Sequence, residues 1–579
     1  MIKSILPEEL GTRPLLDAFR ACRAHFLWAA GFSALVNLLY LTPTLYMMQV
    51  YDRVVPTGGL TTLVLLTLIA AVALAALAAL DWIRGRLLLR AGLRLDRLLS
   101  TRILARVMDR EGPGAGAQIL REFDNVRVAV AGQGALAVFD APWTPIYLLC
   151  CFLLHPAIGL LTLVGGGVLA ALAIANERDG RARLNGALHA ANAAYAAQET
   201  IAGQTEIVRA LGMREASIER QVGQRREAVA RQADAQLAGG RYSSAIKFVR
   251  LTLQSLALGV AAFLAVRGQL SPGSIIASSV LLGRAVAPVE LLVGAWPSLV
   301  QARASLRSIC ELFASTAGQD VQRTALPEPV GQLRLEGVTM LYPDATTPSL
   351  RHVSLALSPG QVLGVIGPSG SGKTTLARIL VGGMRPTSGV IRLDGAAYEA
   401  RPGDDLARHI GYLPQTPSLF AGTVKENIAR FATALEQGRE QVDRDAVAAA
   451  QAAGAHDMIL RLPHGYDTVL GPFGAGLSAG QAQRIALARA MFRDPVLMVL
   501  DEPNSNLDQE GEAALMSAVK SAAGRGATVV IVAHRAGVLT HVDRLLLLAD
   551  GAVQIEGPRE AVLERLRNAG SGLNRKSAA

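Results

Sequence analysis

Six long apolar runs constrain the fold of this chain more than any other feature of its sequence. A helix of about 20 apolar residues crosses the roughly 30 Å hydrocarbon core of a bilayer. The runs lie at residues 26–50, 60–80, 136–154, 157–175, 251–266 and 274–300. Residues 25–318 are therefore predicted to form an α-helical membrane domain with six spans, and an even number of spans places both of its ends on one side.

The charges between these runs predict the orientation of the chain. Residues 82–134 and 177–243 are rich in arginine, whereas the short alternate connections carry only Arg53 and Arg267 as basic residues. Because cytoplasmic loops collect Arg and Lys, both long loops, both termini and the second half of the chain are expected in the cytoplasm. The net charge of +10 arises within residues 1–325, which favours membrane lipid over nucleic acid as its partner.

The segment before the first span and the cysteines exclude two further possibilities. Residues 1–24 mix acidic and basic residues, so they are predicted to be a cytoplasmic lead-in without a cleavable signal. Leu15, Phe19 and Cys22 could place an amphipathic helix of this lead-in on the membrane. The four cysteines form no CxxC pair, so free thiols are expected rather than disulfides or a cysteine-bound metal.

The two long loops are predicted to be helical hairpins. Residues 187–230 are rich in Ala, Gln, Glu and Arg and lack proline, a composition that favours helix. Arms that continue the spans would reach roughly 40 Å into the cytoplasm at 1.5 Å per residue. Residues 119–128 and 205–213, near the hairpin tips, are candidate elements for coupling to a soluble domain; the alternative is that they are solvated linkers.

Two features of the spans could concern the transport path. Arg284 and Glu290 lie within the sixth run, and an ionisable side chain in a bilayer normally faces a bundle interior or a wet cavity. The alternative for Glu290 is that a tilted helix lets it reach the interface. At the start of the third run, residues 140–145 contain two prolines that predict a kink, and Trp143 and Tyr147 suit an interfacial belt.

A change in composition separates the second domain from the first. Residues 319–331 contain two prolines between polar residues and are predicted to be a linker. Strands and helices alternate over residues 332–565, which is typical of an α/β domain with a parallel sheet. Residues 566–579 are predicted to be a flexible C-terminal tail.

A phosphate-binding motif follows the strand predicted at residues 362–366. The loop comprises Gly367, Pro368, Ser369, Gly370, Ser371, Gly372, Lys373, Thr374 and Thr375. This is a Walker A sequence, in which glycines let backbone N–H groups face a phosphate at the helix N-terminus. Lys373 is expected to reach the β- and γ-phosphates of ATP, and Thr374 to bind Mg²⁺.

A second apolar strand, residues 496–500, ends in two acidic residues. Asp501 and Glu502 match a Walker B arrangement, in which the first carboxylate holds Mg²⁺ and the second polarises the attacking water as general base. An apolar run that ends in two acids is by itself only a strand end. Its distance after the Walker A loop makes the assignment specific.

Residues 477–481, Leu-Ser-Ala-Gly-Gln, resemble the signature of ABC ATPases, just before a helix predicted at 482–491. In that superfamily the signature binds ATP held by a second copy, so the resemblance implies a homodimer with Ser478, Gly480 and Gln481 on the nucleotide. It further implies that Tyr342 stacks on adenine, that Gln415 senses Mg²⁺, that Asp508 belongs to the D-loop and that His534 contacts the γ-phosphate. Ala479 replaces the usual glycine, which is tolerable if its φ is negative.

The chain as a whole resembles the type I secretion permease/ATPase family, in its PrtD-like branch. The resemblance is carried by residues 45–56, 139–147, 209–213 and 501–508. It implies the type I ABC exporter fold and a homodimer in the inner membrane of a Gram-negative bacterium. It also implies a periplasmic adaptor, an outer-membrane channel and unfolded protein substrates with C-terminal signals. With about 25 residues before the first span, no N-terminal peptidase domain is expected.

Two other functions are compatible with parts of this sequence. An ABC exporter of lipid or of a small amphiphilic molecule would share every ATPase motif, and only the motifs of the membrane half argue against it. A soluble ABC ATPase that acts on DNA or ribosomes would need a basic ATPase domain, whereas residues 326–579 are electrically balanced.

Overall fold

The computed structural model describes residues 13–109, 116–316, 326–342, 345–401, 403–434, 438–471, 474–533 and 538–576. The chain forms two compact units, Met1–Asp320 and Val321–Ala579. Part of the predicted linker, residues 319–325, and residues 1–12 of the predicted lead-in lie outside the described residues.

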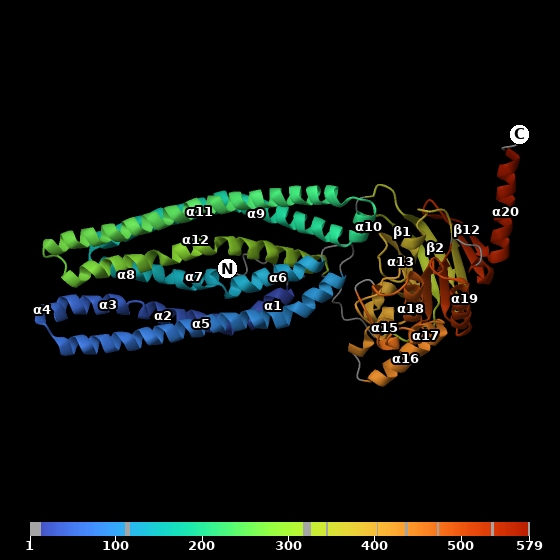
Figure 1. The fold of residues 1–579 in the computed structure, drawn as a ribbon, viewed down its shortest axis with the longest axis horizontal. Coiled ribbons are helices and arrows are strands. Elements are labelled where there is room, and N and C mark those ends of the chain that lie inside the picture. The colour runs from blue at the N-terminus through green and yellow to red at the C-terminus, as the bar shows by residue number, and fades with distance from the viewer. Residues whose placement is uncertain are drawn as a thin grey trace. The chain divides into compact units, whose positions relative to one another are not determined.

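The first unit is helical in all its regular structure among the described residues (Figure 1). Its elements are α1 (Arg13–Ala21), α2 (Arg23–Leu39), α3 (Thr42–Gln49), a π-helix (Val50–Val54), α4 (Val55–Thr57), α5 (Leu60–Asp109), α6 (Gly116–Ala131), α7 (Gln133–Asp140), a 3₁₀ turn (Ala141–Trp143), α8 (Thr144–Leu154), α9 (Pro156–Ala202), α10 (Thr205–Ala210), α11 (Arg214–Val266) and α12 (Pro272–Ser315).

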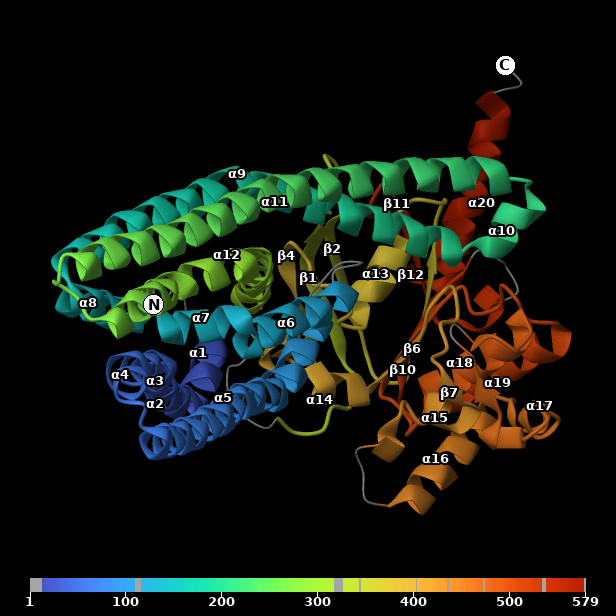
Figure 2. The same cartoon turned by 60° about the vertical axis from the view of Figure 1, so that its left-hand side comes forward.

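The six predicted spans are confirmed. Within the described residues, six helical stretches are long and apolar enough to cross a membrane: Arg23–Thr57, Leu60–Asp109, Ile119–Leu154, Pro156–Ala202, Arg214–Val266 and Pro272–Ser315. Three of them continue well beyond the apolar runs as single helices, with 50 residues in α5, 47 in α9 and 53 in α11. In both views α9 and α11 lie side by side along their lengths (Figure 2).

The third span is interrupted where its two prolines predict it. Helix α7 ends at Asp140, a 3₁₀ turn follows, and α8 begins at Thr144. Proline lacks the N–H that would continue the α-helical hydrogen bonds through this point. Tyr147 lies one turn later and is buried among protein side chains, so this residue does not face outward as expected of an interfacial belt, whereas Trp143 is only partly buried.

A buried polar cluster joins the first three spans near this break. Asp140 accepts hydrogen bonds from Ser33, from Asn37 at 2.8 Å and from Arg84 at 2.7 Å. The Tyr147 hydroxyl donates to the backbone oxygen of Asn37 at 2.7 Å. We call these five residues the Arg84–Asp140 cluster. Since α2, α5, α7 and α8 all contribute to it, the cluster fixes how these helices meet.

The two ionisable residues of the sixth span have partners within the helix bundle. The guanidinium carbon of Arg284 lies 3.6 Å from the centre of the Tyr40 ring, a cation–π contact. Glu290 forms an ion pair at 3.2 Å with Arg250 of α11. The charge of Glu290 is therefore balanced by a neighbouring helix, which does not require α12 to tilt toward the interface.

The predicted amphipathic helix of the lead-in exists, but its apolar face packs against protein. Leu15 of α1 and Cys22, the residue after it, are buried in a cluster with residues of α5, α6 and α12, and Phe19 packs against the same cluster. This corrects the expectation that the helix lies on the membrane. Because α1, α5, α6 and α12 meet at this cluster, the apolar face of α1 is covered by protein side chains rather than by a bilayer.

The two predicted coupling segments differ in exposure. Residues 119–128 belong to α6, whose Ile119, Phe123 and Val126 are buried in the cluster with α1. Residues 205–213 comprise α10 and the turn after it, at the tip of the α9–α11 hairpin, and there Ile207 and Leu211 are 52% and 69% exposed.

The second unit is an α/β domain. Its strands are β1 (Leu333–Met340), β2 (Leu350–Leu357), β3 (Val362–Ile366), β4 (Ser388–Leu393), β5 (Ala396–Ala397), β6 (Ile410–Leu413), β7 (Gly422–Thr423), β8 (Val469–Leu470), β9 (Leu497–Asp501), β10 (Thr528–Val532), β11 (Arg544–Ala549) and β12 (Ala552–Pro558). Its α-helices are α13 (Lys373–Leu380), α14 (Gly403–Arg408), α15 (Val424–Ile428), α16 (Arg439–Ala452), α17 (His456–Leu460), α18 (Ala479–Met491), α19 (Gln509–Gly524) and α20 (Arg559–Lys576). Short 3₁₀ turns lie at Tyr398–Ala400, Ala432–Ala434, Gly465–Asp467 and Val538–His541.

Two larger sheets organise this unit, and β7 and β8 form a separate two-stranded pair. The six-stranded sheet has the order β12-β11-β3-β10-β9-β6, and its strands are parallel except for β12, which pairs antiparallel with β11. The four-stranded sheet has the order β2-β1-β4-β5 and is antiparallel. Strands β9 and β10 are buried along their whole lengths, as expected for strands covered on both faces.

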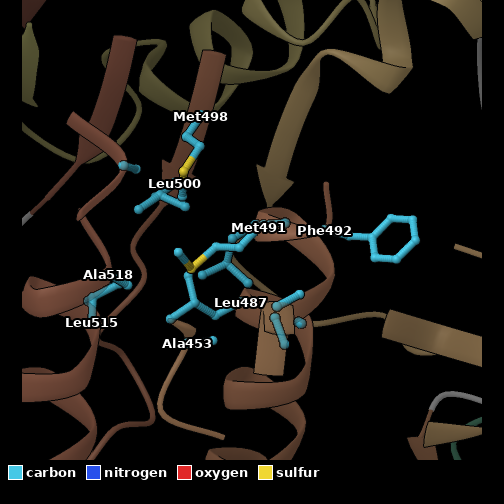
Figure 3. Packing of buried hydrophobic residues seen from close by; sticks show 14 of the residues in the cluster. Ala453, Leu487, Met491, Phe492, Met498, Leu500, Leu515 and Ala518 are labelled. Atoms are coloured by element: carbon cyan, nitrogen blue, oxygen red, sulfur yellow. The ribbon is translucent and has the colours of Figure 1, made fainter. Parts of the chain in front are cut away.

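Two hydrophobic clusters hold the unit together. Figure 3 shows part of the larger one, in which Leu487 and Met491 of α18 lie near Met498 and Leu500 of β9. Helix α18 is thereby anchored to the strand that ends in Asp501. The second cluster packs β1, β2 and β4 together with β3 and α13.

The C-terminal region differs from its prediction. Helix α20 runs to Lys576 and so includes most of the residues expected to be a flexible tail from 566 on. Its first half anchors it, since Val562 is buried against the larger cluster and Leu563 and Leu566 pack on it. The following residues include helix formers and no proline that would end the helix.

Candidate nucleotide site

The parallel strands bring the predicted site segments to one edge of the sheet. Residue Val532 of β10 pairs with Val365 of β3 on one side and with Asp501 of β9 on the other. Leu413 of β6 pairs with Leu500 of β9, so β6 ends at nearly the same level as β3, β10 and β9. The segments that follow these strands therefore emerge together at the carboxyl edge, where open α/β sheets bind their ligands.

The Walker A loop has a backbone that only glycine can adopt at two positions. Gly372, which caps α13, has φ 98°, and a Cβ there would collide with the backbone oxygen of Ser349. A Cβ on Gly367 would collide with the backbone oxygen of Leu548. The loop is thus pressed against its neighbours at both ends, which holds its N–H groups in the arrangement that suits a phosphate.

Lys373 places a positive charge inside this loop. Its Nζ donates hydrogen bonds to the backbone oxygens of Gly367 at 2.9 Å and Pro368 at 2.7 Å. Burial lowers the pKa of Lys373, while the charges of Glu502 and Asp501 act to raise it. A phosphate in the loop would offer this ammonium charged oxygens in place of neutral carbonyls, a stronger hydrogen bond.

Asp501 offers both carboxylate oxygens to a cation. They are buried and make no hydrogen bond of normal geometry with the described residues. Burial raises the pKa of Asp501, and the nearby hydroxyl of Thr374 opposes that effect. A buried carboxylate beside a threonine hydroxyl, with both oxygens free of hydrogen bonds of normal geometry to the described residues, fits Mg²⁺, which uses one or two protein ligands together with substrate phosphates. Within the described ranges, no group of three or more His, Cys, Asp and Glu could hold a metal by itself.

Glu502 has an unusual backbone conformation. Its φ is 50°, in the left-handed region that non-glycine residues seldom occupy, and its N–H donates to the backbone oxygen of Val532 at 3.0 Å. Such strain persists only where the surroundings hold it, and it gathers at functional sites.

The signature segment forms the N-terminus of α18. Ser478 caps the helix by accepting from the N–H of Gln481, whose side chain accepts from the N–H of Ser478 in return. This capping box starts the helix at Ala479, three residues before the predicted start. Ala479 is helical and is not among the residues with positive φ, so the replacement of the usual glycine causes no strain.

The remaining predicted site residues lie in different surroundings. The Tyr342 hydroxyl lies 3.3 Å from that of Thr375, next to the Walker A helix. Gln415 is exposed two residues after β6. Asp508 caps α19 through the N–H of Gly511 at 2.8 Å. His534 lies outside the described residues.

Sequence reasoning missed Gln483, and it placed Asn506 only within residues 501–508, without a role of its own. Gln483 of α18 and Asn506 bind each other at 2.9 Å, close to Glu502. A polar residue between buried apolar positions of a helix was the available signal, because a buried amide needs a partner.

The helical membrane unit, the two sheets and the Walker A loop together define an ABC exporter. Residues 350–505 match the family model "ABC transporter". The fold resembles a solved structure described as a bacterial Atm1-family ABC exporter with ATP bound, with a TM-score of 0.79 over 96% of this chain and 99% of that one. Sequence identity to it is 21%, so that likeness concerns the fold.

Sequence relatives define the family more narrowly. The chain is 43% identical over 94% of its length to the type I secretion system ATP-binding protein PrsD of Rhizobium meliloti (strain 1021), covering 93% of that protein. It is 27% identical to the leukotoxin translocation ATP-binding protein LktB of Mannheimia glucosida, over 94% of this chain and 77% of that one. The chain belongs to the type I secretion family of ABC exporters, ATPases coupled to transport across a membrane.

Proposed function

We propose that this chain is the inner-membrane half-transporter of a type I protein secretion system. Two copies would use ATP to export an unfolded protein with a C-terminal signal, together with a periplasmic adaptor and an outer-membrane channel. The observation that carries the proposal is the 43% identity to PrsD over 94% of the chain, which includes the membrane half. That half is where exporters of different substrates diverge.

ATP and Mg²⁺ are the proposed ligands of the carboxyl edge of the sheet. The backbone of residues 367–375 would hold the phosphates, with Lys373 among their oxygens. Asp501, Thr374 and Gln415 would hold Mg²⁺, whose charge neutralises the phosphates as the γ-phosphate leaves. Glu502 would polarise the attacking water, and His534 would contact the γ-phosphate. The left-handed backbone of Glu502 supports a functional assignment for it.

The other half of each nucleotide site would come from the second copy. Ser478 is exposed and Gly480 partly exposed at the N-terminus of α18, a helix of 13 residues whose dipole favours negative charge. A phosphate held by a second copy could reach these N–H groups. A homodimer of this kind would contain two composite sites.

Movement would pass to the membrane through the hairpin tips. The exposed apolar side chains of Ile207 and Leu211 at the tip of the α9–α11 hairpin support a coupling role for residues 205–213. Most of the apolar face of residues 119–128 is already covered, and Val128, which is 62% exposed, is the apolar side chain left for a contact of that segment.

The Glu502→Gln variant tests the catalytic assignment. We expect it to bind ATP with unchanged affinity and to lose steady-state hydrolysis, since a neutral amide cannot act as base. Glu440→Gln, the same change at an exposed position of α16, is the control and should retain full turnover. Hydrolysis that persists in Glu502→Gln would rule out this base.

The same variant tests the class of substrate. A protein trapped on Glu502→Gln in cells, and absent from the Glu440→Gln control, would be sequenced, and its C-terminal segment fused to an unrelated reporter. Secretion of the reporter in the presence of the wild-type exporter supports protein export. Enrichment of a lipid or amphiphile with the trapped exporter, without a trapped protein, would favour the alternative function.

A further inference from the structure

Gln483 is completely buried on a helix whose other buried positions are apolar. The buried residues of α18 are Gln483, Ile485, Ala486, Leu487, Ala488, Ala490 and Met491. An amide removed from water costs free energy unless its donors and acceptor find partners. The position of Gln483 therefore depends on the hydrogen bonds it makes.

These bonds join α18 to the segment that begins with Glu502. Nε2 of Gln483 donates to the backbone oxygen of Pro503 at 2.6 Å and lies 3.4 Å from that of Glu502. Its Oε1 accepts from Nδ2 of Asn506 at 2.9 Å and lies 3.5 Å from the hydroxyl of Ser505. One side chain thus holds both ends of residues 502–506.

Two further contacts join the same two segments. A Cβ on Gly480 would lie 3.0 Å from the backbone oxygen of Asn506, so the first turn of α18 packs directly on that segment. Arg484 forms an ion pair with Asp508 at 2.7 Å. Together these contacts join residues 480–484 of α18 to residues 502–508.

Glu502 is held from two sides as a result. Its N–H is bonded to Val532 of β10, and its carbonyl oxygen lies within reach of Gln483 of α18. A left-handed backbone at a non-glycine residue relaxes unless several contacts oppose it. Gln483 supplies the contact on the side of the signature helix.

We propose that Gln483 is a positioning residue for ATP hydrolysis. It fixes the backbone of Glu502 and Pro503, and through Asn506 the following turn, relative to the first turns of α18. Each copy would contribute Glu502 to one of the two nucleotide sites and its signature segment, residues 477–481, to the other. Within a copy, these two elements would then move together as one rigid body. The inference rests on the proposed role of Glu502 as base.

Two variants test it in the full-length protein in lipid. Gln483→Leu keeps the side-chain volume near that of Gln and removes all its hydrogen bonds, whereas Asn506→Ala removes one partner at an exposed position. We expect kcat to fall about 10–100-fold in the first variant and about 3–10-fold in the second, with KM for ATP within about threefold, because misplaced groups slow chemistry more than binding. Gln441→Leu, on the exposed face of α16, is the control.

The Glu502→Gln background separates positioning from folding. Adding Gln483→Leu to Glu502→Gln should leave the ATP dissociation constant within about threefold of that of Glu502→Gln alone. A residue that only positions the base has no further effect once the base has been removed. Loss of ATP binding in the double variant would make Gln483 a structural residue and overturn the inference. Unchanged kcat in both Gln483→Leu and Asn506→Ala would also overturn it. Turnover that persists in Glu502→Gln alone would instead overturn the assignment of the base.

Discussion

Breaking the Arg84–Asp140 cluster tests how the first three spans are held together. The side chains of Arg84 and Asp140 are 4% and 12% exposed and meet at 2.7 Å. Asp140→Leu leaves the guanidinium buried, with Asp81 as its remaining carboxylate partner at 2.7 Å. Removing one partner of a buried ion pair costs about 3–5 kcal/mol.

The remaining contact with Asp81 sets the expected loss near the lower figure. Asp81 is 46% exposed and therefore less buried than Asp140, so its ion pair with Arg84 replaces only part of the lost contact. We therefore expect about 3 kcal/mol, which lowers the unfolding midpoint by roughly 6–12 °C at 2–4 °C per kcal/mol. The double variant Arg84→Met/Asp140→Leu should recover most of this loss, because no buried charge is left unpaired.

A thiol-reactive dye can follow the unfolding of the membrane unit alone. All four cysteines, Cys22, Cys150, Cys151 and Cys310, belong to that unit, and three of them are buried. The control is Asp124→Leu, which breaks the exposed pair between Asp124 and Arg127 within α6 and should cost less than about 1 kcal/mol. Equal midpoints for Asp140→Leu and wild type, or single effects that simply add in the double variant, would refute the reasoning.

Two further predictions concern the ATPase unit. Gly372→Ala should weaken ATP binding more than about tenfold, because φ 98° and the collision of the new Cβ with the backbone oxygen of Ser349 force the loop to move. Binding is measured with a fluorescent nucleotide. The control is Gly524→Ala, whose Cβ would meet nothing within 4 Å and which should bind ATP normally. Two hydrogen bonds hold the pKa of Asp508 below its usual 3.8: the larger effect comes from the N–H of Gly511 and the smaller from the side chain of Arg484. A carboxyl group whose pKa is lower in the folded than in the unfolded state stabilises the fold at pH values above its unfolded-state pKa, and this stabilisation is lost as the pH falls through the folded-state pKa. The difference in unfolding free energy between wild type and Asp508→Asn should therefore be constant near neutral pH and shrink below pH 3.8. A difference that stays constant down to about pH 3 would contradict this account.

Local patterns predicted the elements that carry the chemistry. Spans and buried strands are continuous apolar runs, and the Walker A loop is a contiguous motif between a strand and a helix, so each could be recognised without knowing its neighbours. The six spans are confirmed, and β3 and β9 lie within about one residue of the strands predicted at 362–366 and 496–500.

Contacts between distant segments could not be predicted in the same way. Asp140 was identified only as part of a proline kink, because its partner Arg84 lies 56 residues away and nothing in the sequence pairs them. Gln483 was missed since its partners follow another strand. The surroundings of the lead-in helix and of α20 were predicted wrongly for one reason. Tertiary packing decides whether an apolar helix face meets membrane, solvent or protein, and the sequence of the helix alone does not show this.

The length of α11 has a mechanical consequence. At 1.5 Å per residue its 53 residues form a rod of about 80 Å, of which the bilayer core accounts for about 30 Å. Paired along its length with α9, this rod resists bending, so a rotation at one end is transmitted to the other. A rotation of about 10° about the membrane surface moves a tip about 45 Å away by roughly 8 Å, so a displacement of that size at the hairpin end is needed to tilt the spans by the same angle.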